Sequence, residues 1–164
     1  MPSPTLEEVN ASGGNVAYIR GLELTCSAWS ETKLVINGFK DRYLGTEDGR
    51  TLFWKAINLG IALPAKDGKG NQTLNFAVDN STGEVTDLVD LSVEANASVT
   101  CVYRTWLSSN TSAPSERPYR LTVLGGELQG IIANLEAGYF NILNTAYPRR
   151  YLTADYAPGL RYIL

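Results

Sequence analysis

VAYIRGLELTCSAW, residues 16–29, is the stretch of sequence that best indicates the fold. Apolar side chains recur at every second position, at Leu22, Leu24 and Cys26, with polar side chains between them. An alternation with a period of two residues is typical of a strand that buries one face and exposes the other. The stretch therefore predicts a half-buried strand on the core of a β-rich domain.

Further segments with β-type composition or alternation follow along the chain. They are residues 33–39, 51–63, 74–78, 99–107 and 121–124, and an ambiguous segment from Glu127 onward. Turn-forming residues separate them: Asp48-Gly49 predicts a tight reversal, and Gly125-Gly126 predicts a tight hairpin. Neighbouring segments joined by such turns favour antiparallel pairing over βαβ crossovers.

Two segments have helical character instead. Residues 81–91 space their apolar side chains three to four positions apart, which predicts a short amphipathic helix. Its cap is expected at Ser81 or Thr82. Residues 4–9 resemble the start of a second, shorter helix.

The chain is therefore predicted to be mainly β: an antiparallel β-sandwich or partly open barrel with one or two short flanking helices. Its length suits one core, so residues 1–164 are expected to form a single domain. Residues 108–118, rich in Ser, Asn, Thr and Pro, predict an extended loop that is longer than a hairpin needs and suits a contact arm. Residues 147–164 show no clear strand pattern and are expected to form a carboxy-terminal arm.

The composition argues against several kinds of function. Lys and Arg number 14 against 17 Asp and Glu, a net charge of −3, so no basic surface for nucleic acid or an anionic membrane is indicated. No window approaches the length of a transmembrane helix, so no membrane insertion is expected. The amino-terminal residues are acidic and polar, unlike a signal peptide, and we expect synthesis for the cytoplasm.

The chemistry of common active sites is also missing from the sequence. There is no histidine, which removes Ser-His-Asp and Cys-His catalysis and the usual zinc ligand sets. Cys26 and Cys101 are too few for a four-cysteine metal site and are expected to be buried, reduced thiols. The segment Asp67-Gly68-Lys69-Gly70 lacks the spacing of a phosphate-binding loop. No enzymatic activity, catalytic residue, metal or cofactor is therefore expected.

Two alternatives use residues that the chain does contain. A glycosidase needs only two carboxylates, and the candidates are Glu47-Asp48, Asp87 with Asp90, Glu127 with Glu136, and the isolated Asp155. Each is more simply explained as a solvated residue. A sugar-binding platform would use aromatic rings, but Trp29, Trp54 and Trp106 fall in or beside expected strands, which favours packing in the core or at a subunit interface.

Landmarks along the chain point to a known family. They are Pro4–Ser12, Ile19–Leu24 leading into Leu34–Ile36, Ile57–Pro64, Leu74–Asn80, and a close made of Tyr147–Tyr151 and Ala157–Leu160. By these landmarks the sequence resembles the small minor tail proteins of long-tailed, non-contractile bacteriophages over nearly its whole length. The Pro-Gly-Leu ending after an Arg-Tyr segment is the most specific of them.

The resemblance implies a structural component of a phage tail tip, similar to a distal tail or tail-hub subunit. Such subunits form rings, of three or six copies here, that join the tail tube to the tip. The implied partners are further copies of this chain, the tail tube, the tape measure protein, the tip or hub proteins and the central fibre protein. The implied location is the tail tip of the virion, after assembly in the host cytoplasm. A carbohydrate- or receptor-binding β-sandwich module is the alternative function.

The carboxy-terminal arm is the expected contact surface with a neighbouring subunit, because aromatic and arginine side chains are enriched at interfaces. The expected interface residues are Tyr147, Arg149, Arg150, Tyr151, Tyr156, Leu160, Arg161 and Tyr162. Deletion of the residues after Tyr156 is expected to abolish ring assembly and to leave a folded monomer.

Overall fold

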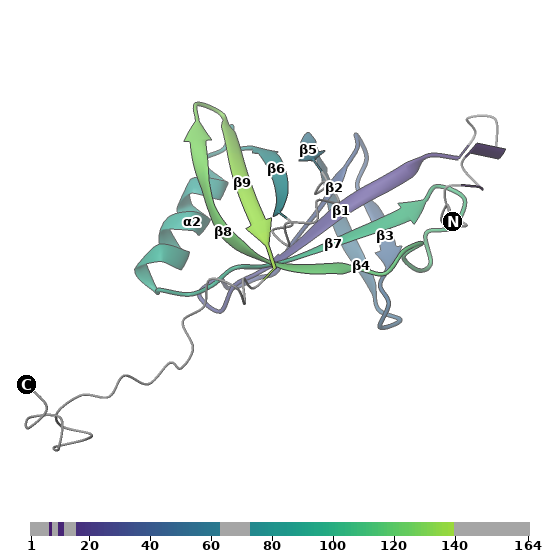
Figure 1. Ribbon diagram of the computed structural model, residues 1–164, viewed down its shortest axis with the longest axis horizontal. Helices are drawn as coiled ribbons and strands as arrows, with labels where there is room; N and C mark the ends of the chain where they lie inside the picture. Colours follow the sequence, from purple (N-terminus) through teal and green to yellow (C-terminus); the bar gives the residue numbers. More distant parts are fainter. Residues whose placement is uncertain (1–6, 8–9, 12–15, 63–72, 140–164) are drawn as a thin grey trace, which may run out of the picture.

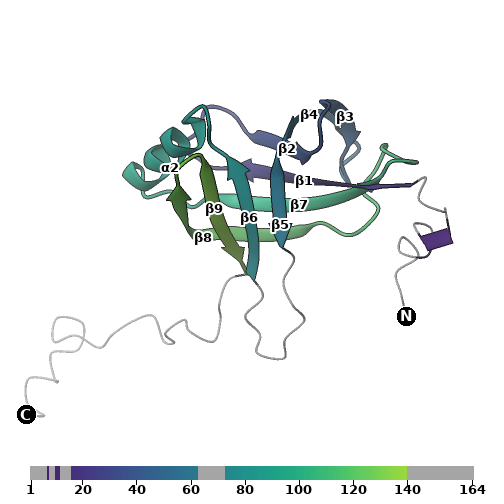
Figure 2. The same ribbon diagram turned by 90° about the horizontal axis from the view of Figure 1, so that it is seen from above.

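The computed structural model describes residues 7, 10–11, 16–62 and 73–139 (Figures 1 and 2). Of the helix expected at residues 4–9, only Glu7 is among them, and it is helical. The carboxy-terminal arm at 147–164 lies outside the described residues.

The described residues form one nine-stranded sheet and one complete helix. The strands are β1 (Tyr18–Thr25), β2 (Lys33–Asn37), β3 (Arg42–Gly45), β4 (Thr51–Ile57), β5 (Leu59–Ala62), β6 (Thr73–Asp79), β7 (Thr100–Leu107), β8 (Tyr119–Gln129) and β9 (Ile132–Gly138), and the helix is α2 (Glu84–Glu94). Their order in the sheet is β3-β4-β2-β1-β7-β8-β9-β6-β5. Pairing is antiparallel except between β2 and β4, which run parallel. The predicted mainly β class, a sandwich or partly open barrel with a short helix, is confirmed.

The sheet curls around β7, whose residues Cys101–Leu107 are all buried. One face of β7 contributes Cys101 and Tyr103 to a core shared with β1, β5, β6, β8 and β9. The other face contributes Trp106 to a second core shared with β1, β2, β3 and β4. A strand that packs against a hydrophobic core on each of its faces buries consecutive residues. The burial of β7 is therefore continuous and does not alternate. The end strand β5 then approaches β2 without pairing with it, so the barrel is partly open.

The segment predicted as one β region at 51–63 is two strands with different places in the sheet. β4 pairs with β2 and β3, whereas β5 pairs with β6 at the opposite end of the strand order. Only Asn58 separates the two strands. A break of one residue leaves the apolar composition continuous, which is why the pattern alone did not reveal it.

The tight hairpin predicted at Gly125-Gly126 is wrong. β8 continues through both glycines, and the reversal comes at Gly130, whose φ is +61°. A Cβ on Gly126 would lie 2.5 Å from the backbone oxygen of Asn134, so this glycine permits a close approach of β9. The register shifts between Val123 and Gly125, as in a β-bulge. The glycines therefore bend the strand instead of ending it.

Helix α2 confirms the helix predicted at 81–91, displaced by three residues along the chain. Its start is not capped by Ser81 or Thr82. Asn80, which is buried, accepts a hydrogen bond from the backbone N–H of Val85 at 3.0 Å and donates one to Thr86 Oγ1 at 2.8 Å. The backbone N–H of Asn80 also donates to the carbonyl of Ile131, which joins the start of α2 to the β8–β9 turn.

The loop predicted at 108–118 is present, but it is anchored to its own chain. The backbone N–H of Gly45 donates to the carbonyl of Thr111 at 2.9 Å, and that of Ser115 donates to the carbonyl of Thr105 at 2.8 Å. A Cβ on Gly45 would collide with the backbone of Ser112, so the loop packs on a strand that must carry glycine there. The role of the loop as a contact arm stays a prediction.

Candidate functional site

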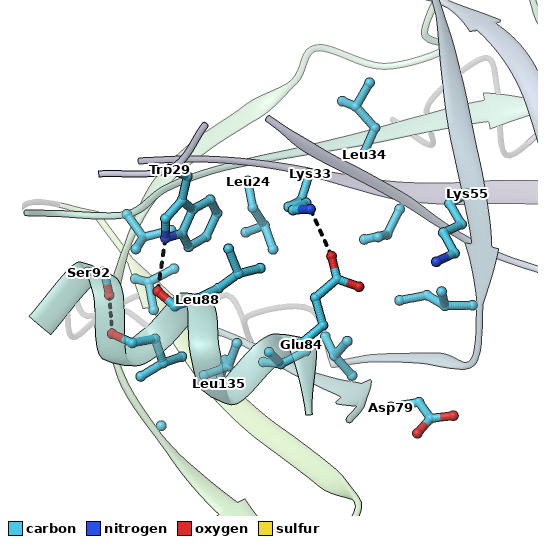
Figure 3. A pocket seen from close by; sticks show the side chains of 18 of the residues that line it. Leu24, Trp29, Lys33, Leu34, Lys55, Asp79, Glu84, Leu88, Ser92 and Leu135 are labelled. Carbon is cyan, nitrogen blue, oxygen red and sulfur yellow. Dashed lines mark hydrogen bonds and ion pairs between the residues drawn. The ribbon is translucent and has the colours of Figure 1, made fainter. Parts of the chain in front are cut away.

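A large groove lies between helix α2 and the sheet, and we call it the α2 groove (Figure 3). Its volume is about 1550 Å³. Residues from β1, β2, β4, β6, β8 and β9 face α2 across it, together with Trp29 from the β1–β2 connection. Pockets for small molecules usually measure about 300–1,000 Å³, so this groove is larger than one small ligand needs.

The groove is continuous with the hydrophobic core. Leu24, Val85, Val123 and Leu135 line it and also pack against the buried residues of the first core. The indole N–H of Trp29 donates to the backbone carbonyl of Leu88 in α2 at 2.9 Å. The groove is therefore the open mouth of the barrel, with α2 held across it.

Charged residues mark the edge of the groove. Lys33 Nζ and Glu84 Oε1 form an ion pair at 2.8 Å, with side chains 31% and 50% exposed (Figure 3). The hydrogen bond from Lys33 and its charge lower the pKa of Glu84. Lys55 and Asp79 also line the groove.

Helix α2 itself is acidic. It carries Glu84, Asp87, Asp90 and Glu94 and no Lys or Arg. Its last turn holds no basic residue, so Glu94 lies at the negative end of the helix dipole without compensation from its own helix. Of these acids only Glu84 lines the groove, and it is paired with Lys33.

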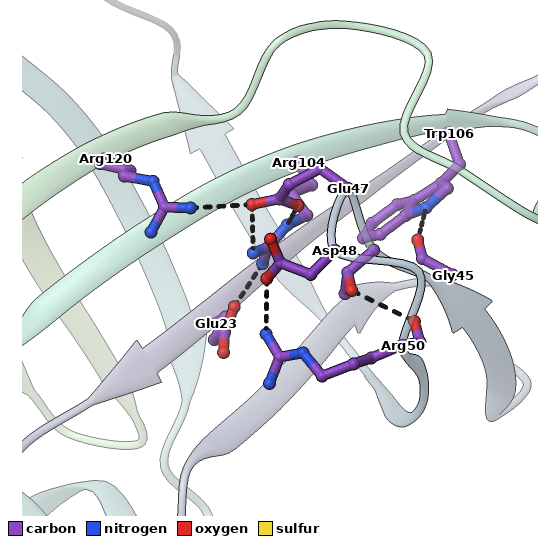
Figure 4. A network of polar contacts seen from close by, with 9 residues as sticks. Glu23, Gly45, Glu47, Asp48, Arg50, Arg104, Trp106 and Arg120 are labelled. Atoms are coloured by element: carbon purple, nitrogen blue, oxygen red, sulfur yellow. Dashed lines mark hydrogen bonds and ion pairs between the residues drawn. The ribbon is translucent and has the colours of Figure 1, made fainter.

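A second notable cluster surrounds Arg104 on the side of β7 away from the groove core (Figure 4). The Arg104 side chain, 1% exposed, donates to Glu47 through Nε at 2.6 Å and Nη2 at 3.0 Å, and to Glu23 through Nη1. Arg120 Nη2 donates to the same Glu47 at 2.9 Å. Two-point contacts between guanidinium and carboxylate are strong and directional. The cluster therefore fastens the β3–β4 turn onto β1, β7 and β8.

The electrostatics of the cluster favour fixed charges. The hydrogen bonds from Arg104 lower the pKa of Glu47 from 4.5 to about 2, against the opposing effect of burial. Burial would lower the pKa of Arg104, but its hydrogen bonds to Glu47 and Glu23 outweigh that effect and raise it. A carboxylate held ionised by buried arginine is a poor proton donor near neutral pH. The cluster is thus structural in character.

This cluster adds to one prediction. Glu47 lies in a turn and is exposed, as predicted, but its side chain, 26% exposed, also anchors Arg104. Its neighbour Asp48 does pair with Arg50 in the open, at 3.0 Å. The other described candidate carboxylates, Asp87, Asp90, Glu127 and Glu136, are exposed as predicted.

Exposed aromatic side chains gather at the β3–β4 end of the sheet. Phe39 is fully exposed, Tyr43 is 69% exposed and Phe53 is 51% exposed. The rings of Tyr43 and Phe53 are 5.1 Å apart between centroids. We call these three residues the β3–β4 aromatic patch, and two of them, Phe39 and Phe53, also line the α2 groove.

The tryptophans and cysteines can now be placed. Trp54 and Trp106 are fully buried with ring centroids 5.0 Å apart, so the prediction of core packing is confirmed for them, and Trp29 lines the α2 groove. Cys26 and Cys101 are buried and free, as predicted. Burial raises the pKa of Cys101 to about 12, so its thiol stays protonated.

All eight expected interface residues fall outside the described residues. They are Tyr147, Arg149, Arg150, Tyr151, Tyr156, Leu160, Arg161 and Tyr162. Sequence reasoning did not find the α2 groove, the Arg104 cluster or the aromatic patch. Phe39 was predicted as the last residue of the strand at 33–39, but β2 ends at Asn37 and leaves Phe39 in the following connection.

Within residues 16–62 and 73–139, with Glu7, Asn10 and Ala11, no group of three or more His, Cys, Asp or Glu side chains is arranged to hold a metal ion. The same part of the chain contains no helix of the length and hydropathy needed to cross a bilayer.

Comparison with models of protein families shows the family of this chain. A model of the family described as "Domain of unknown function (DUF1833)" matches residues 5–151, which is most of the chain. Curated proteins gave no match.

Proposed function

The chain belongs to the DUF1833 family, and we propose that it is a structural component of a bacteriophage tail tip. In this proposal it builds a distal tail or hub ring of three or six copies in the virion. It contacts the tail tube, the tape measure protein, the tip or hub proteins and the central fibre protein. It is assembled in the host cytoplasm and acts by binding, without catalysis.

The observation that carries the assembly role is the β3–β4 aromatic patch at the edge of the sheet. Among the described strands β3 pairs only with β4, and on its other side the N–H of Gly45 is taken by the carbonyl of Thr111. Phe39, Tyr43 and Phe53 stand exposed around this edge. Contiguous exposed apolar surface marks a contact site, and aromatic residues dominate the energetics of such sites. A second copy of the chain is the partner that ring assembly calls for here.

The identity of the assembly comes from the sequence resemblance. Two of its landmarks have clear roles in the described structure. Leu34–Ile36 lies within β2. Leu74–Asn80 covers most of β6 and includes Asn80, whose side chain accepts a hydrogen bond from the backbone N–H of Val85 at the start of α2. The resemblance therefore involves residues that define the barrel and its helix, which is the rigid scaffold that a ring subunit requires.

The oligomeric state of the purified full-length chain tests the assembly role. Light scattering after size exclusion, with negative-stain electron microscopy, is expected to show rings of three or six copies. Replacing Tyr43, which does not line the α2 groove, by Ser should shift the population to monomers. Replacing Ile131, an equally exposed apolar residue in the β8–β9 turn, by Ser is the matched control and should leave the rings intact. A chain that stays monomeric at its highest soluble concentration contradicts the proposal.

The phage assignment needs its own measurement. Gold-labelled antibody against the chain is expected to bind at the tip of phage tails, on particles released by the host that encodes it. Label on no part of such particles would refute the assignment and leave the assembly role to be judged on the rings alone.

A carbohydrate- or receptor-binding module is the alternative, and Trp29 in the α2 groove is the observation that favours it. Trp54 and Trp106 are buried and cannot stack on a sugar. Binding on a glycan array that is lost in Trp29→Ala, with matching quenching of Trp29 fluorescence, would favour this alternative.

A further inference from the structure

We propose that the α2 groove receives the carboxy-terminal segment, residues 140–164, of a neighbouring copy of the chain. The inference rests on the proposed function in one respect, since it requires copies that assemble. It goes further by naming the surface that accepts the arm.

The size and walls of the groove suit a peptide segment. Its volume of about 1550 Å³ exceeds the usual range for small-molecule pockets. Its walls are mostly apolar and run into the hydrophobic core through Leu24, Val123 and Leu135. The segment 140–164 offers matching side chains, which include Phe140, Ile142, Leu143, Leu152, Leu160, Ile163, Leu164 and four tyrosines.

The charged side chains of the groove balance one another. Lys33 and Lys55 line it, and so do Asp79 and Glu84. Lys33 is already paired with Glu84, and the other acids of α2 do not line the groove. The match between the groove and residues 140–164 is therefore one of apolar side chains.

The direction of β9 favours a neighbouring copy as the acceptor. β9 runs antiparallel to β8 and passes Leu128 near its start and Thr122 at its end, opposite Gly138. The part of β8 that lines the groove runs from Val123 to Leu128. The chain therefore leaves the sheet heading away from the groove wall of its own β8. A segment of 25 residues spans at most about 80–90 Å when extended, which is enough to reach another subunit.

Photo-cross-linking in the full-length chain tests the proposal. A benzophenone amino acid is placed at Leu128 or Val93, two exposed residues that line the groove. Chains labelled with ¹⁵N are mixed with unlabelled chains before assembly, and cross-linked peptides are identified by mass spectrometry. The expected products join the groove position to residues 140–164 and include pairs of mixed isotope. The same group at Asp48, in an exposed turn, is the control and should give no such products.

Each other outcome overturns the proposal. Cross-links of a single isotope would mean that each arm fills its own groove. Cross-links to other segments, or none to residues 140–164, would mean that the groove has another occupant. Light scattering on the same samples tests the proposed function separately. Rings that form without these cross-links would contradict the proposed role of the groove and would still support the assembly role.

Discussion

Two ion pairs join distant parts of the chain, and they differ in how much water they meet. Arg104 holds Glu47 across 57 positions of sequence, with its side chain 1% exposed and with a further contact to Glu23. Arg120 contacts the same Glu47. Lys33 holds Glu84 across 51 positions, but both side chains remain substantially exposed and the contact is single. The first lies over the Trp54–Trp106 core, and the second lies at the mouth of the α2 groove.

The difference indicates that the two ion pairs have different roles in the barrel. A buried, multiply bonded pair fixes geometry, because losing one partner leaves a charge without solvent. An exposed pair contributes little to stability and can exchange partners readily. One side of the molecule is therefore closed by its own residues, whereas the groove side is available to another chain.

The largest effect is expected from removing Trp106, which is fully buried and donates its indole N–H to the carbonyl of Gly45 at 2.7 Å. Trp106→Ala should lower the free energy of unfolding by about 3–5 kcal/mol, as expected for loss of a large aromatic side chain from a core. Leu88→Ala, at the half-buried groove wall, should cost about 1 kcal/mol. Urea denaturation measures both. Equal losses of unfolding free energy in the two variants would contradict the distinction between the closed side at the Trp54–Trp106 core and the side that holds the α2 groove.

Neighbouring acids in one turn give the next comparison. Glu47→Gln removes the anionic partner of a buried arginine and should cost about 2–3 kcal/mol, somewhat less than a fully orphaned buried charge because Glu23 remains. Asp48→Asn breaks only the exposed pair with Arg50 and should cost about 0–1 kcal/mol. Thermal and urea unfolding of the two variants should separate them clearly. A similar small cost for both would mean that the Arg104 cluster is not a structural anchor.

Acid should weaken the closed side through Glu47. Its pKa is lowered from 4.5 to about 2 in the folded chain, so its contribution is complete above about pH 4.5 and is lost as the pH falls toward 2. Glu84 is shifted in the same direction and adds to the loss. Unfolding measured between pH 6 and pH 2 should therefore depend less on pH in Glu47→Gln than in the natural chain. Parallel pH profiles would show that Glu47 has no such linkage.

The smallest effect is expected at the groove. A double-mutant cycle on Lys33→Ala and Glu84→Ala should give a coupling of at most about 1 kcal/mol, reduced further by salt. Coupling that equals that of Arg104 with Glu47 would remove the contrast between the two pairs.

Much of the fold could be predicted because its signals are local. Alternation at Leu22, Leu24 and Cys26 identified β1, and the change of spacing at 81–91 identified α2. Residues whose role depends on a distant partner were misjudged. Gly126 was expected in a turn, yet its backbone lies against Asn134 of the next strand. β3, only four residues long, has too little sequence for alternation to be visible.

The candidate site was harder to predict for the same reason. Glu47 stands in a sequence that is typical of a turn, and nothing local shows that Arg104 reaches it. The groove is formed by residues of six strands and a helix, so no short motif encodes it. The absence of histidine, by contrast, needs no structure and could be read directly.

The junction at Asn58 has a mechanical consequence. β4 is next to one end of the strand order and β5 is the other end, and yet the two strands are joined through this one residue. Three consecutive Cα atoms span at most about 7 Å, so the two ends of the sheet cannot drift apart while the backbone is intact. Among the described strands, the barrel has no hydrogen-bonded strand pair between its two ends, and the backbone at Asn58 connects them covalently instead. Fraying of β5 from β6 would leave β5 tethered to β4, whereas a single proteolytic cut at Asn58 would allow the barrel to unroll.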